Sequence, residues 1–164
     1  MQQLGISLQV LQSSIEQAQG HDLEQWYSIL FHLLGFSPSQ FGGTKRSVPD
    51  IVAFPSIGNW ILVVECTEGE PDLGSKLAKL STRAKLAGQG LGSIKAHPVL
   101  ITSMSRGLLN QTDMEKASKE GISVVTAEDL SHLVKMAREN QDPERVLGYL
   151  QARIPSTSLG GNYT

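Results

Sequence analysis

The sequence predicts an α/β protein in which a mixed central β-sheet is flanked by helices. Two kinds of segment indicate this class. Short, almost continuous apolar runs, such as residues 60–67, are typical of strands that are buried on both faces. Segments whose apolar residues are spaced three and four apart, which is typical of helices that cover a sheet, alternate with these runs.

The composition is that of one globular domain. The chain has 164 residues and a mass of 17.8 kDa, with 40% apolar and 18% charged residues, which is sufficient for a single core. No apolar run reaches the length of a membrane span, and the N-terminus lacks the features of a signal peptide. Cys66 is the single cysteine, so no internal disulfide is possible and a cytoplasmic location is expected.

The charge of the chain is small but unevenly distributed. A net charge of −2 and a pI near 6.1 are not typical of a nucleic-acid-binding domain. Between Asp72 and Arg106, however, six basic residues accompany a single acid. This local surplus is either a solvated helix face or a surface that attracts nucleic acid.

Two helices are expected at the N-terminus. Residues 4–19 carry apolar side chains at intervals of four and three, a stripe that would pack on the domain itself or on a sister subunit. Residues 22–34 follow with a capping-box-like start and a wide apolar face. Residues 37–47, which contain Lys45 and Arg46, are expected to form a loop or an irregular hairpin.

The next elements are expected to be two strands and a basic helix. Residues 48–54 and 60–66 are joined by a short turn-rich link, which predicts an antiparallel hairpin. Residues 73–87 then form a helix with leucines and alanines on one face. A basic stripe flanks that face and consists of Lys76, Lys79 and Arg83.

The remaining elements alternate before the chain ends in two helices. Strands are expected at residues 97–103 and 122–125, with a helix opened by a capping box at Thr112 and closed by Gly121 between them. Thr126 is expected to cap the next helix, and the last helix runs from Pro143 to about Arg153. The chain is therefore divided into an N-terminal helix (1–19), one α/β domain (20–154) and a tail with the composition of disorder (155–164).

Two acids within the predicted hairpin are the strongest candidates for function. Glu65 ends an apolar strand, where a carboxylate is costly to bury, and Asp50 lies in the preceding apolar strand. Two carboxylates on neighbouring strands could hold a divalent cation such as Mg²⁺, which prefers hard oxygen ligands. The backbone carbonyl of Cys66 would be a suitable third ligand. Such a metal site, together with a nearby cation, meets the requirements of phosphodiester hydrolysis.

Residues 20–138 resemble the PD-(D/E)XK nuclease superfamily, which has the restriction-endonuclease-like fold. The resemblance rests on Pro49-Asp50, on the apolar strand that ends in Glu65, on the basic helix, and on the strand-helix-strand-helix order that follows. Within this region, residues 99–134 are most similar to Mrr-type restriction domains. The resemblance implies that Asp50 and Glu65 bind Mg²⁺ or Mn²⁺ and that Glu24 is an accessory acid on the first helix of the domain.

The resemblance also implies what this domain acts on. The expected activity is cleavage of double-stranded DNA by a homodimer, because one such site cuts one strand. Basic residues would contact the phosphate backbone, namely Lys45, Arg46, Lys76 and Arg83. The chain shows no sequence-reading motif, so target choice would come from another domain, another subunit or DNA structure.

The chain departs from the superfamily pattern at one position. Thr67 stands where the pattern has a lysine, two residues after Glu65. Either a lysine from the following helix replaces it, with Lys79 favoured over Lys76, or the domain is inactive and binds nucleic acid or mediates assembly. Structural roles are the alternatives for the acids: Asp50 could cap backbone donors, Glu65 could form an ion pair with a lysine, and Glu24 could interact with its own helix dipole.

Overall fold

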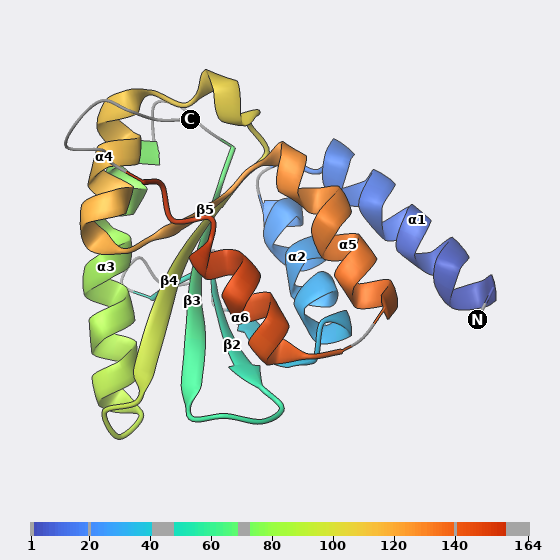
Figure 1. Ribbon diagram of the computed structural model, residues 1–164, viewed down its shortest axis with the longest axis horizontal. Coiled ribbons are helices and arrows are strands. Elements are labelled where there is room, and N and C mark those ends of the chain that lie inside the picture. Colours follow the sequence, from blue (N-terminus) through green and yellow to red (C-terminus); the bar gives the residue numbers. More distant parts are fainter. Residues whose placement is uncertain (1, 20, 41–47, 69–72, 140, 157–164) are drawn as a thin grey trace.

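A five-stranded mixed sheet with helices on both faces forms the centre of the computed structural model (Figure 1). The structure describes residues 2–19, 21–40, 48–68, 73–139 and 141–156. The strands lie side by side in chain order; β1 pairs with β2 and β2 with β3 in antiparallel fashion, whereas β3 pairs with β4 and β4 with β5 in parallel. Their bounds are β1 (Phe36–Gln40), β2 (Ile51–Pro55), β3 (Trp60–Thr67), β4 (Lys95–Thr102) and β5 (Ser123–Val125).

The helices form two layers that enclose the sheet. On one face lie α3 (Leu73–Gly90) and α4 (Gln111–Glu120). The other face is covered by α1 (Gln2–Gln17), α2 (His21–Leu33), α5 (Leu130–Glu139) and α6 (Pro143–Gln151), as Figure 1 shows. Each layer has its own apolar core, so the sheet is buried on both faces. Short 3-10 turns at Arg106–Leu108 and Ala127–Asp129 connect elements at one end of the parallel strands.

Strand β3 shows why the sequence reads as almost continuously apolar. Side chains of successive strand residues point to opposite faces of the sheet. Leu62, Val64 and Cys66 belong to the core beneath α2 and α5, whereas Ile61 and Val63 belong to the core beneath α3. The same alternation places the side chain of Glu65 on the α3 side. A strand buried on both faces therefore directs its one acid towards the basic helix.

The predicted fold class is confirmed, with local corrections. The expected hairpin of β2 and β3 forms, but the first part of the predicted loop at 37–47 belongs to the edge strand β1. The sequence of β1, Phe-Ser-Pro-Ser-Gln, has no pattern typical of a strand. The segment is a strand because its backbone pairs with β2. Helix α3 also continues past its expected end, through Gly88, and α4 is capped by Asn110 instead of Thr112.

The N-terminal helix packs on its own domain. Leu8, Leu11 and Ile15 of α1 are buried in the same core as α2 and α5. The tail at 157–164 and the loop basic residues Lys45 and Arg46 lie outside the described residues. Within the part of the chain that is described, no helix is long and apolar enough to cross a membrane.

Candidate functional site

Asp50 and Glu65 converge at the end of the β2–β3 hairpin. The register pairs Ile51 with Val64, so its continuation by one residue places Asp50 opposite Glu65 on the same face of the sheet. The carboxylate of Asp50 also accepts a hydrogen bond from the backbone N–H of Cys66, with 2.8 Å between Oδ2 and N. This bond fixes the Asp50 side chain against β3 and brings the two acids together.

The pair is crowded and largely removed from water. Glu65 is 1% exposed and Asp50 is 9% exposed. Burial is the main reason why the pKa of Glu65 rises from its ordinary value of 4.5 to about 7, and the neighbouring Asp50 carboxylate raises it further. The guanidinium of Arg83 opposes this rise without cancelling it. Glu65 is therefore an acid whose pKa is raised by burial and by a like charge, and such acids are often found at functional sites.

Helix α3 supplies the cations that face the two acids. Lys76 donates a hydrogen bond to the backbone carbonyl of Cys66 with 2.6 Å between Nζ and O, and its Nζ lies 3.7 Å from Asp50 Oδ2 and 4.0 Å from Glu65 Oε2. Arg83 forms an ion pair with Glu65 through its Nη1 atom. The expected alternative of an ion pair at Glu65 is thus realised, with an arginine as the contacting partner.

The structure places Lys76, and not Lys79, beside the acids. Successive residues of an α-helix are rotated by about 100°, so Arg83 is about 20° from Lys76 around the helix axis, whereas Lys79 is about 60° from it. Lys79 is turned to the exposed side of α3, while Lys76 and Arg83 are half-buried. The choice of Lys79 as the replacement lysine is corrected on this ground. The spacing of seven residues between Lys76 and Arg83, which places both on one side of a helix, is the feature of the sequence that could have indicated this.

Glu24 and the side chain of Cys66 lie on the other face of the sheet. Glu24 is buried on α2, and Cys66 belongs to the core beneath that helix. Burial raises the pKa of the Cys66 thiol, and the charges of Asp50 and Glu24 raise it further, so Glu24 is near the strand end without sharing the face of Asp50 and Glu65. This position suits an accessory acid, but it does not make Glu24 a third member of the pair.

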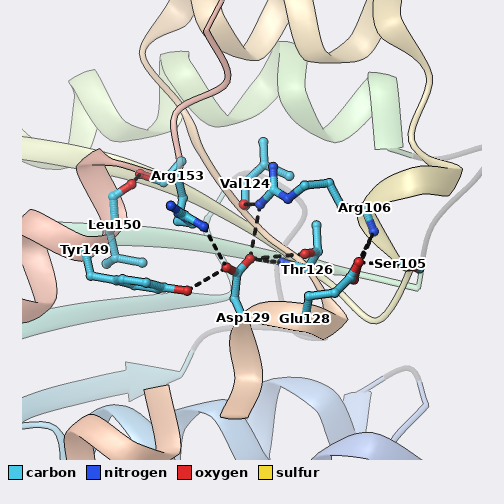
Figure 2. A network of polar contacts seen from close by, with 10 residues as sticks. Ser105, Arg106, Val124, Thr126, Glu128, Asp129, Tyr149, Leu150 and Arg153 are labelled. Atoms are coloured by element: carbon cyan, nitrogen blue, oxygen red, sulfur yellow. Dashed lines mark hydrogen bonds and ion pairs between the residues drawn. The ribbon is translucent and has the colours of Figure 1, made fainter. Parts of the chain in front are cut away.

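A fourth buried acid, Asp129, shows what a structural carboxylate looks like in this fold (Figure 2). Its oxygens accept hydrogen bonds from Tyr149 at 2.6 Å and from the backbone N–H of Thr126 at 2.8 Å, and they pair with Arg106 and Arg153. Burial alone would raise the pKa of Asp129, yet these partners outweigh it and lower the pKa. Asp129 links the start of α5 to β5 and α6, and both of its carboxylate oxygens are occupied by these contacts.

The residues at the hairpin end fit a divalent cation. Asp50 and Glu65 provide hard carboxylate oxygens, and the pKa of Glu65 is raised first by burial and then by the charge of Asp50, which a dication between the two acids would offset. The carbonyl oxygen of Cys66 is at the same place, where it accepts the bond from Lys76. Among the described residues no group of three His, Cys, Asp or Glu side chains converges, so water and substrate would complete the coordination of a metal held here.

Comparison with known proteins supports the fold. The chain has the restriction-endonuclease-like fold, with its mixed sheet and helices on both faces. It is similar to the crystal structure of the small subunit of a heterodimeric restriction endonuclease, with a TM-score of 0.67 and 15% sequence identity over 92% of this chain and 87% of that chain. No protein-family model matches the sequence. No curated protein matches it either.

Proposed function

We propose that this chain is a metal-dependent endodeoxyribonuclease of the PD-(D/E)XK type, with residues 99–134 closest to Mrr-type domains. Its metal would be Mg²⁺ or Mn²⁺, held by Asp50 and Glu65. The observation that supports the proposal is the convergence of these two desolvated acids beneath a lysine from the following helix. The restriction-endonuclease-like fold is consistent with it.

Each residue of the pair and its cations has a distinct task in this proposal. A bound Mg²⁺ would lower the pKa of a water molecule and polarise the phosphodiester. Asp50 and Glu65 bind the ion and, through their bonds to β3 and α3, fix its place at the strand end. Lys76 takes the role of the lysine that Thr67 replaces, because its ammonium group can donate to the attacking water and to the charge that develops on the phosphate.

The proposed substrate is double-stranded DNA. Lys76 and Arg83 of α3 and the loop residues Lys45 and Arg46 would contact the phosphate backbone, a contact that depends on salt concentration. Since one such site cuts one strand, a double-strand break needs a homodimer or a second subunit. The similar structure is one subunit of a heterodimeric restriction endonuclease, which favours a second subunit as the partner.

Plasmid nicking tests this proposal. The purified protein is expected to relax supercoiled plasmid when Mg²⁺ or Mn²⁺ is present and to lose this activity in EDTA. Asp50→Asn and Glu65→Gln proteins should bind DNA but not nick it, while Asp113→Asn, on the surface helix α4, serves as a matched control that nicks like the parent. Metal-independent nicking, or full activity of both site variants, would contradict the proposal.

A second candidate function is a nuclease-fold module that binds nucleic acid or mediates assembly without cutting. The observation that favours it is that Arg83 already pairs with Glu65 and Lys76 already bonds to the Cys66 carbonyl. If Arg83 and Lys76 keep these contacts at all times, they take the place of the metal. Salt-sensitive DNA binding with neither nicking nor Mn²⁺ binding would identify the chain as such a module.

A further inference from the structure

Arg83 is the cation in closer contact with the carboxylate of Glu65. Its guanidinium contacts Glu65 Oε1, while Lys76 lies 4.0 Å from Oε2 of the same carboxylate. Glu65 is 1% exposed, and the side chain of Arg83 is itself only 17% exposed. The contact is therefore shielded from water, and salt in the solvent screens it only weakly.

A divalent cation and Arg83 cannot both use Glu65 in the observed arrangement without conflict. Arg83 contacts Oε1 and leaves Oε2 to a metal ion, but two positive groups held on one poorly solvated carboxylate repel one another. Lys76 lies against all three proposed ligands and would also have to move, but a third of its side chain is exposed, so its ammonium group can turn towards solvent. Arg83 is the more buried of the two cations, so its charge is the more persistent obstacle to a metal ion at Glu65.

The surroundings of Arg83 determine what can draw it away. Its side chain lines a groove of about 410 Å³ between α3 and β2, and the walls of that groove are mainly apolar, with Val52, Phe54 and Leu86 among them. A guanidinium that leaves a carboxylate needs another anion, and a phosphate group matches its paired donors. DNA lying across the strand end would bring phosphates to the mouth of this groove.

We infer that Arg83 is a gating residue that competes with the metal for Glu65, and that a DNA phosphate relieves this competition by pairing with Arg83. The inference rests on the proposed metal site. Metal and DNA then bind cooperatively, and by linkage each tightens the binding of the other by the same factor. Without DNA the protein keeps Glu65 paired with Arg83, and the metal binds at full affinity only when DNA is present.

Mn²⁺ binding tests the inference without reference to cleavage. Free Mn²⁺ is measured by electron paramagnetic resonance, with and without a short DNA duplex, and the Mn²⁺ bound by the duplex alone is subtracted. For the parent protein we expect the duplex to tighten Mn²⁺ binding by about tenfold, within the range usual for coupled sites. Arg83→Gln should bind Mn²⁺ about tenfold more tightly than the parent in the absence of DNA and should lose most of the effect of the duplex.

Two further proteins keep the test decisive. Lys85→Gln removes one positive charge from the exposed side of the same helix and should behave like the parent. Arg83→Met retains the apolar stem that lines the groove and replaces Arg83→Gln should that protein fail to fold by circular dichroism. Unchanged Mn²⁺ affinity in both Arg83 variants would overturn the gating role. The Asp50→Asn protein distinguishes a failure of this inference from a failure of the proposed metal site. Parent-like Mn²⁺ binding by that protein would contradict the metal site itself.

Discussion

Replacement of Glu65 by glutamine should make the stability of the metal-free protein depend on pH in a different way. The pKa of Glu65 in the folded protein is raised from 4.5 to about 7 by burial and by Asp50. An acid with a raised pKa holds its proton in the folded state at pH values where the unfolded chain has lost it. Its contribution to stability is complete below about 4.5 and is lost as the pH rises to about 7.

The magnitude follows from the size of this rise. At about 1.36 kcal/mol for each pK unit, a rise from 4.5 to about 7 corresponds to about 3 kcal/mol of unfolding free energy. His97 titrates in the opposite direction, because burial lowers its pKa from 6.5 to about 4 and stability is lost as the pH falls through that range. The two effects partly cancel in the parent, so the difference between parent and variant isolates Glu65.

Urea denaturation in EDTA, followed by circular dichroism, measures this difference. The stability of Glu65→Gln relative to the parent is expected to increase by about 3 kcal/mol between about pH 4.5 and about pH 8. A matched variant of an exposed acid, Glu139→Gln, should show no such trend. A stability difference between Glu65→Gln and parent that stays constant with pH would show that Glu65 is neither desolvated nor crowded by Asp50, and would refute the reasoning.

Three other expectations follow from the structure. Lys76→Met should reduce the rate of plasmid nicking by about 100- to 1000-fold, as the loss of a transition-state donor does. Lys79→Met should cut at nearly the parent rate, because Lys79 is on the exposed side of α3. Equal effects of the two substitutions would contradict the assignment of this role to Lys76. Asp129→Asn should lower the unfolding free energy by about 2 kcal/mol in urea denaturation, because the charged acceptor of the hydrogen bonds from Arg106 and Tyr149 is lost. Gly88→Ala should destabilise by about 1–3 kcal/mol, since a Cβ there would lie 2.5 Å from a backbone carbonyl oxygen, while Gly90→Ala, which meets no atom within 4 Å, should be neutral or stabilising in the same assay.

The sequence by itself determined the fold class and the two acids. Apolar runs of strand length alternate with helical patterns, which predicts a sheet between helix layers, and the turn-rich link at 55–59 predicts the hairpin of residues 51–67. Asp50 and Glu65 stand out in the sequence because their neighbours are so apolar that a carboxylate needs a reason to be there. Both features depend on residues that are neighbours in the chain, so the sequence alone reveals them.

Only the tertiary structure decided which groups meet. Strand register placed Asp50 opposite Glu65, and the rotation of α3 about its axis turned Lys76 and Arg83 inward and Lys79 outward. The edge strand β1 and the partners of Asp129 likewise depend on segments distant in the sequence. The physical reason is that a periodic pattern defines the face of a helix or strand, whereas the neighbour across a gap is set by how the two layers pack together.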